Sequence, residues 1–119
     1  MFVVTNNPKV KAYFGEDAIR FVDGTYEDVL IKVRDLIHVN HKLLTHPLSG
    51  SVKPNETPYK SIAVESGDRF DMEGLNLIEK AIETYNKLQK DSTTPNWIER
   101  VKDDFMVIDF DLIKNALRK

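Results

Sequence analysis

The sequence contains no cysteine among its 119 residues. This absence excludes a disulfide framework, thiolate metal ligands, a thiol nucleophile and dithiol redox chemistry on this chain. The formal net charge is −2, with lysine and arginine spread along the chain, so the basic stripe that is typical of nucleic-acid-binding proteins is missing. No apolar run approaches the roughly 20 residues that a membrane span needs. We therefore expect neither a nucleic-acid nor a membrane partner.

Several short motifs are absent too. The beginning of the chain lacks the basic and long apolar regions of a signal peptide, which predicts a cytoplasmic protein. No glycine-rich dinucleotide or phosphate loop and no nucleophile elbow occurs, so we expect no cofactor and assign no catalytic residue. Length, 41% hydrophobic residues and 30% charged residues are ordinary for one globular domain, predicted over residues 1–119.

Short apolar, β-branched runs alternate with amphipathic stretches, and this alternation predicts an α/β fold. Since helical connections join parallel strands, we expect a small mixed, mostly parallel sheet of about five strands covered by amphipathic helices. The strand near 42–45 is predicted to be central. The five predicted strands lie near residues 2–5, 18–22, 42–45, 61–65 and 105–108.

Helix-start signals accompany the amphipathic stretches. Asn7 and Pro8 predict the N-cap and first residue of a short helix, and Thr25 with Asp28 predicts a capping box before a helix near 26–38. Further helices are predicted near 72–89, after an Asp71 cap, after Thr94-Pro95, and at the C-terminus, where Asp109 or Asp111 is the expected cap.

The first candidate site is Thr5-Asn6-Asn7, which follows the first predicted strand. Ligands of open α/β sheets favour the carboxyl ends of strands, where helix N-termini offer free N–H groups. These three polar side chains are therefore candidates for contacting an amide, a base or a phosphate. The alternative interpretation is that they only cap the following helix.

The second candidate is the long segment 45–61. Loops of this length without regular structure are often functional, and its prolines restrict its conformations. Gly50 allows close backbone approach to an anion, with Lys53 or Lys60 as the counter-charge. The alternatives are a rigid structural loop or a homodimer contact. The candidate binding residues of the segment are Thr45, His46, Gly50, Ser51, Lys53, Asn55, Glu56, Thr57, Tyr59 and Lys60.

The two candidates are predicted to form one cleft. The first turn and the long segment follow the first and third predicted strands, and loops after parallel strands leave a sheet at the same edge. If these two strands are neighbours, residues 5–7 and 45–61 line one cleft. The polar groups of the cleft would then bind an anionic ligand or a partner.

Three histidines, His38, His41 and His46, lie close in sequence. His38 and His41 share a helix face only if the helix continues past His38. A zinc site normally needs a third ligand and often a carboxylate in its second shell. We therefore predict no bound metal.

Three stretches together resemble the GrdX family, small proteins associated with glycine reductase operons of amino-acid-fermenting anaerobes. These stretches are Val4-Thr5-Asn6-Asn7-Pro8, residues 32–38 and residues 43–61. The resemblance implies an accessory binding or assembly role beside glycine, sarcosine or betaine reductases, with a reductase component as the partner. It implies no catalytic residues. The alternative function is a small-molecule binder or enzyme that acts on an anionic metabolite or nucleotide.

Overall fold

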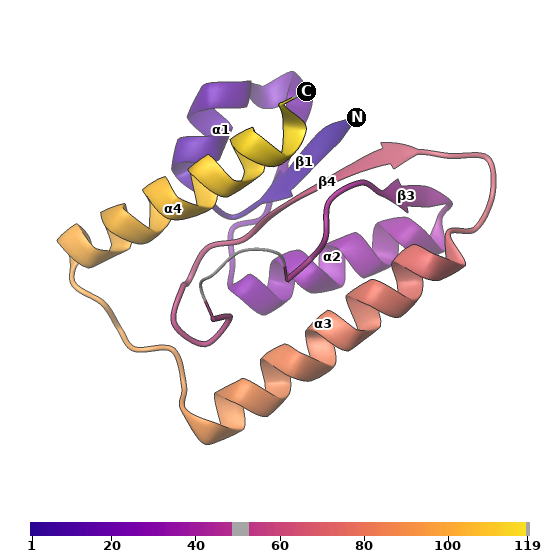
Figure 1. The fold of residues 1–119 in the computed structure, drawn as a ribbon. Helices are drawn as coiled ribbons and strands as arrows, with labels where there is room; N and C mark the ends of the chain where they lie inside the picture. Colours follow the sequence, from indigo (N-terminus) through magenta and orange to yellow (C-terminus); the bar gives the residue numbers. More distant parts are fainter. Residues whose placement is uncertain (49–52, 119) are drawn as a thin grey trace.

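The computed structural model describes residues 1–48 and 53–118. A four-stranded sheet lies between two layers of helices (Figure 1). Gly50 and Ser51, two of the predicted site residues, lie outside the described residues. No helix in the described ranges is long and apolar enough to cross a bilayer.

The strands are β1 (Phe2–Thr5), β2 (Ile19–Phe21), β3 (His41–Leu43) and β4 (Ser61–Ser66), arranged in the order β2-β1-β4-β3. β1 pairs in parallel with β2, whereas β4 is antiparallel to both β1 and β3. The sheet is mixed, but the prediction of about five mostly parallel strands is wrong. Helices connect β1 to β2 and β2 to β3. The described parts of the connection from β3 to β4, residues 44–48 and 53–60, contain no helix, and β4 runs antiparallel to β3.

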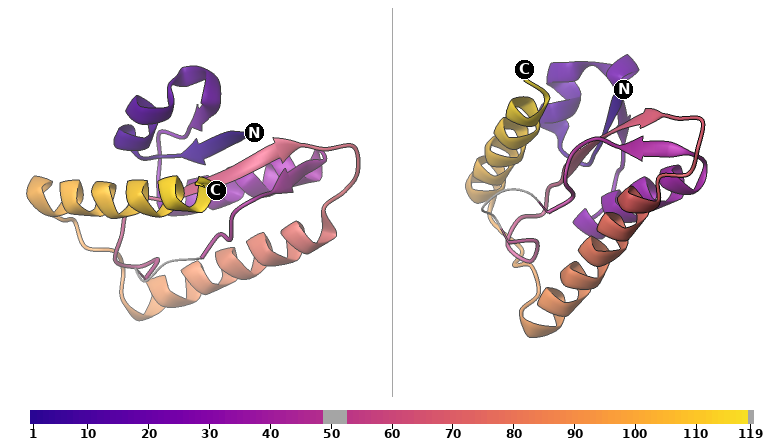
Figure 2. Two further views of the ribbon diagram at one scale, coloured as in Figure 1. Left: turned by 45° about the horizontal axis from the view of Figure 1, so that its top comes forward. Right: turned by 45° about the vertical axis from the view of Figure 1, so that its right-hand side comes forward.

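One face of the sheet is covered by α2 (Tyr26–His38) and α3 (Met72–Asp91), which lie side by side (Figures 1 and 2). Val4, Ile62 and Val64 point toward these helices, because alternate residues of a strand face the same side. The predicted capping box of α2 is present, and the Asp71 side chain caps α3 through Gly74 N–H at 2.9 Å.

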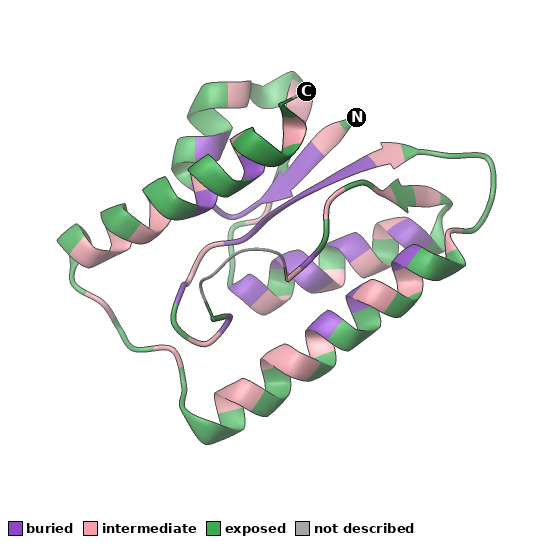
Figure 3. Cartoon of the chain, in the orientation of Figure 1, coloured by how far each residue is buried: buried purple, intermediate pink, exposed green. Residues whose placement is uncertain are grey.

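The opposite face is covered by α1 (Pro8–Phe14) and α4 (Glu99–Leu117). Val3 and Ala63 pack there against Val10 of α1 and Ile113 of α4. A 3₁₀ turn, Glu16–Ala18, leads from α1 to β2. β1 and β4 are therefore buried on both faces, whereas most of α4 is exposed (Figure 3).

The C-terminal quarter differs most from the prediction. The strand predicted near 105–108 is wrong, because these residues belong to α4, which is one continuous helix. Asp109 and Asp111 lie inside this helix and are not its N-cap. The helix predicted directly after Thr94-Pro95 is also wrong, because residues 93–98 form neither helix nor strand and α4 begins after the N-cap Ile98. A four-residue apolar run does not distinguish a strand from a helix by periodicity.

The position of the third strand is also corrected. β3 lies at the edge of the sheet, next to β4, and the central pair is β1 and β4. β3 is half-exposed, whereas β4 is buried over its first four residues. β1 and β3 are thus parallel but separated by β4.

Candidate functional site

The carboxyl end of β1 lies at an edge where several segments meet. β1, β2 and β3 all run toward this edge, and the antiparallel β4 begins there. The polar side chains at the edge are buried. Thr5 and Asn7 are fully buried, and Asn6 has 7% of its surface exposed. Polar groups at this depth need hydrogen-bond partners.

A hydrogen-bonded chain of side chains joins β1, β4 and α4. Asn7 N–H donates to Thr5 Oγ1 at 3.0 Å, and the hydroxyls of Thr5 and Ser61 are 2.7 Å apart. Ser61 Oγ donates to Asp109 Oδ2 at 2.7 Å, and Asn7 Nδ2 donates to the same oxygen at 3.0 Å. The second Asn7 donor bond reaches Met106 O at 2.9 Å. This chain attaches α4 to the sheet.

Asn6 joins three connections of the chain through its side chain. Its Nδ2 donates to Gly24 O at 3.1 Å and to Pro58 O at 2.8 Å, and its Oδ1 accepts from Lys60 N–H at 2.9 Å. Asn7 Oδ1 accepts from Lys9 N–H at 3.0 Å, the predicted cap. The side-chain groups of both asparagines are therefore used by the protein itself.

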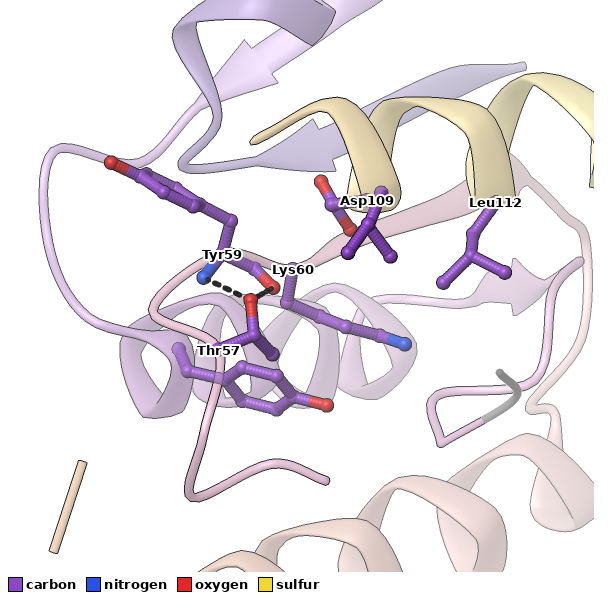
Figure 4. A pocket seen from close by; sticks show the side chains of 7 residues that line it. Thr57, Tyr59, Lys60, Asp109 and Leu112 are labelled. Atoms are coloured by element: carbon purple, nitrogen blue, oxygen red, sulfur yellow. Dashed lines mark hydrogen bonds between the residues drawn. The ribbon is translucent and has the colours of Figure 1, made fainter. Parts of the chain in front are cut away.

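Among the described lysines only Lys60 is buried, with 7% of its surface exposed. It runs between Leu112 of α4 and Thr57 into a small cavity, here termed the lysine hollow (Figure 4). The cavity volume is about 20 Å³, room for about one water molecule. The lining residues are Tyr26, Thr57, Tyr59, Lys60, Ile108, Asp109 and Leu112.

The ammonium of Lys60 lacks the partner that buried charges usually have. Within residues 1–48 and 53–118 it forms neither an ion pair nor a hydrogen bond. It lies 6.0 Å from the ring centroid of Tyr26, at the outer limit of a cation–π contact. A cationic side chain is thus enclosed with incomplete compensation.

Burial acts on both charged groups of the lysine hollow. It lowers the pKa of Lys60, and the negative charge of Asp109 opposes this shift. Burial likewise raises the pKa of Asp109, while the hydrogen bonds from Asn7 and Ser61 and the charge of Lys60 oppose that shift. Each residue is therefore held closer to its neutral form than an exposed group would be.

A larger groove adjoins the lysine hollow and shares Tyr26, Thr57 and Tyr59 with it. This tyrosine groove has a volume of about 310 Å³, at the lower end of the range for small-molecule sites. Tyr85 of α3 stacks on Tyr26 with ring centroids 5.3 Å apart. The lining residues are Asn6, Gly24, Thr25, Tyr26, Thr57, Pro58, Tyr59, Tyr85, Thr94 and Lys102.

The remaining predicted site residues divide into two groups. Thr45 and His46 line a second small cavity, which Lys60 also lines. Thr45 Oγ1 accepts a hydrogen bond from Ala63 N–H at 3.0 Å. His46 Nδ1 accepts one from Leu48 N–H at 3.0 Å. Lys53, Asn55 and Glu56 line neither the lysine hollow nor the tyrosine groove.

Two residues of this second group, Asn55 and Glu56, contact the connection between α3 and α4. Lys53 is exposed. Asn55 Nδ2 donates to Ser92 O at 3.0 Å, and Glu56 O accepts from Trp97 Nε1 at 2.7 Å. These two hydrogen bonds join residues 55–56 to the connection between α3 and α4.

The three histidines lie in different surroundings. α2 ends at His38, whose ring lies 5.9 Å from that of Phe70, and His41 begins β3 with its Nδ1 3.1 Å from Leu36 O. In the described part of the chain, no group of three or more histidine or acidic residues is placed to hold a metal ion.

The most important site residue missed by sequence reasoning is Asp109, which was predicted only as a possible cap. Tyr26, Ile108 and Leu112 also line the lysine hollow and are not among the predicted site residues. On a helix over residues 105–113, Asp109 lies three residues after Met106 and four before Ile113, so the three side chains share one face. A carboxylate on a buried helix face is the signal that could have identified it.

A family model described as GrdX-like protein matches residues 2–118, essentially the whole chain. No curated protein and no solved structure matches the chain.

Proposed function

The chain belongs to the GrdX-like family, and we propose that it is an accessory binding protein of glycine, sarcosine or betaine reductase systems. We also propose that it binds an anion beside Lys60. The absence of cysteine means that its contribution is binding and not thiol redox chemistry. The anionic ligand is a small metabolite, since the tyrosine groove beside the lysine hollow has the volume of a small-molecule site.

The burial of Lys60 without an ion pair is the observation that supports this function best. Enclosing an uncompensated ammonium costs free energy, and a bound anion would offset that cost. Natural proteins retain such destabilising groups where function requires them. Lys53, the other predicted counter-charge, is exposed and outside both cavities, so the proposed role falls on Lys60 alone.

Thermal melting against a panel of carboxylates, phosphate esters and nucleotides tests the anion site. A ligand at about 100 times its dissociation constant adds about 2.7 kcal/mol to the free energy of unfolding, which raises Tm by several degrees in a domain of this size. We expect at least one anion to raise the Tm of the wild type and of Lys53→Met, but not that of Lys60→Met.

Lys53→Met is the matched control, because it removes the same charge from an exposed position in the same segment. A panel without any active anion, or an anion-induced shift that survives in Lys60→Met, would contradict the proposed site. The unliganded Tm of each variant shows that it is folded.

Affinity capture from cells that ferment glycine, with the tagged chain as bait, tests the accessory role. We expect a glycine, sarcosine or betaine reductase component to be recovered with the wild type. Low salt is used because salt screens the charges that hold weak interfaces together. Recovery of no reductase component under these gentle conditions would count against the accessory role.

A further inference from the structure

We propose that Lys60 is a nucleophile that forms a reversible imine with a small carbonyl compound, an aldehyde or a 2-oxo acid. This inference rests on the proposed binding role of the same residue and names the class of ligand. It goes further because it assigns a covalent step to a chain in which no sequence motif predicts one.

The surroundings of Lys60 are those that an imine-forming amine needs. Reactive lysines are desolvated in apolar pockets so that a neutral amine is available for attack. The lysine hollow has apolar walls from Ile108 and Leu112 and the ring of Tyr26 beneath the amine. Because the amine forms no ion pair in the described part of the chain, no carboxylate contact fixes it in the ammonium form.

Asp109 is placed to serve the proton transfers of this reaction. It lines the lysine hollow together with Lys60, and its Oδ2 is held by Asn7 and Ser61. Burial raises the pKa of Asp109, which favours the protonated form that can donate to a departing hydroxyl. Asp109 would thus act as the general acid, with its orientation set by two neighbouring side chains.

The reaction balances without an oxidant or a reductant. The lone pair of neutral Nζ attacks the carbonyl carbon as the carbonyl π bond breaks, and one Nζ proton passes to the oxygen, which becomes a hydroxyl. Asp109 gives a proton to this hydroxyl, which leaves as water while the carbon–nitrogen double bond forms, and the carboxylate then takes the remaining Nζ proton. Hydrolysis by one water molecule regenerates the free amine and the carbonyl compound.

The cavities suit a ligand whose carbonyl end is small. The lysine hollow has room only for a group of about the size of a water molecule, whereas the tyrosine groove can hold the rest of the ligand. Lys102 of α4 lines this groove and supplies a positive charge for the carboxylate of a 2-oxo acid. An aldehyde or 2-oxo acid would therefore reach from the groove to Nζ.

Reductive trapping with glyoxylate tests the inference. Sodium cyanoborohydride reduces the imine to a stable carboxymethyl-lysine, which peptide mass mapping assigns to a residue. At neutral pH we expect Lys60 to be labelled faster than Lys53 and Lys102, because burial lowers the pKa of Lys60 and the neutral amine is the form that attacks the carbonyl carbon. In urea this preference should vanish, because it depends on the folded cavity.

Lys60→Arg separates the imine from simple anion binding. Arginine keeps the positive charge but forms no trapped product, so we expect this variant to retain an anion-induced rise in Tm and to lose the labelled peptide. Labelling of wild-type Lys60 no faster than that of Lys53 would overturn the imine. If the imine is overturned but an anion still raises the Tm of the wild type and not that of Lys60→Met, the proposed anion site is retained. If no anion raises the Tm of the wild type either, both the anion site and the imine are contradicted.

Discussion

Replacing Asn7 with alanine is expected to lower the free energy of unfolding by about 4 kcal/mol. The Asn7 side chain is fully buried and caps α1 through Lys9 N–H. Its Nδ2 also donates to Met106 O and to Asp109 Oδ2. The substitution removes a cap, worth about 1 kcal/mol. It also removes the bond to Met106 O, worth about 1 kcal/mol, and one of the two side-chain bonds to Asp109 Oδ2, worth about 2 kcal/mol, while the bond from Ser61 Oγ remains.

Urea unfolding at neutral pH measures this effect. Asn86→Ala is the matched control, because Asn86 is exposed on α3 and exposed substitutions usually change stability by less than about 0.5 kcal/mol. A loss below about 1 kcal/mol for Asn7→Ala would show that its two donor bonds to α4 contribute little. The same result would weaken the conclusion that these bonds attach α4 to the sheet.

Replacing Asp109 with alanine is expected to cost about 3 kcal/mol at neutral pH, because donors to a buried carboxylate lose their partner. Asn7 Nδ2 and Ser61 Oγ are the donors affected. Asp111→Ala is the control, since Asp111 is exposed two residues further along the same helix. Equal effects of the two substitutions would contradict the buried role of Asp109.

The pH dependence of the Asp109→Ala effect has a definite sign. Burial raises the pKa of Asp109 above the value of the unfolded chain, about 3.9, so the folded state binds more protons between the two values. The stability that the carboxyl group contributes is therefore fully present at acid pH and decreases as pH rises through the raised pKa. Above that value the difference between wild type and variant becomes constant.

Much of the N-terminal half follows from local signals. Asn7-Pro8 predicts the start of α1, and Thr25 with Asp28 predicts the start of α2, because a cap needs only residues within one turn of the helix end. Asp71 before α3 is identified in the same way. These predictions are confirmed. They succeed because the hydrogen bonds that decide them join residues that are close in sequence.

The C-terminal half depends on contacts that no local pattern reveals. Phe105 to Ile108 is apolar and β-branched enough to predict a strand, yet these residues are helical in a helix that packs on the sheet through Ile113 and bonds to Asn7. The edge position of β3 likewise follows from pairing with β4, which is distant in sequence. Tertiary packing decides both features.

The candidate site is predictable only in part, for the same reason. Thr57, Tyr59 and Lys60 are in the predicted segment and line the lysine hollow. The sequence around Lys60 does not distinguish it from Lys53. The burial of Lys60 depends on residues of α2 and α4 that pack over it and are distant in sequence. The turn at 5–7 is predicted as a ligand site or a helix cap, and the structure shows that its side chains form hydrogen bonds within the protein.

The central claim is that Lys60 is a buried amine held ready for a ligand, and a pH titration of the lysine side chains by NMR tests it most directly. With lysine ¹³C-labelled at Cε, the Lys60 resonance is assigned by its absence from Lys60→Arg. Burial lowers the pKa of Lys60, so we expect its resonance to titrate below the ordinary lysine value of about 10.4. A Lys60 resonance that titrates at or above that value would contradict the account.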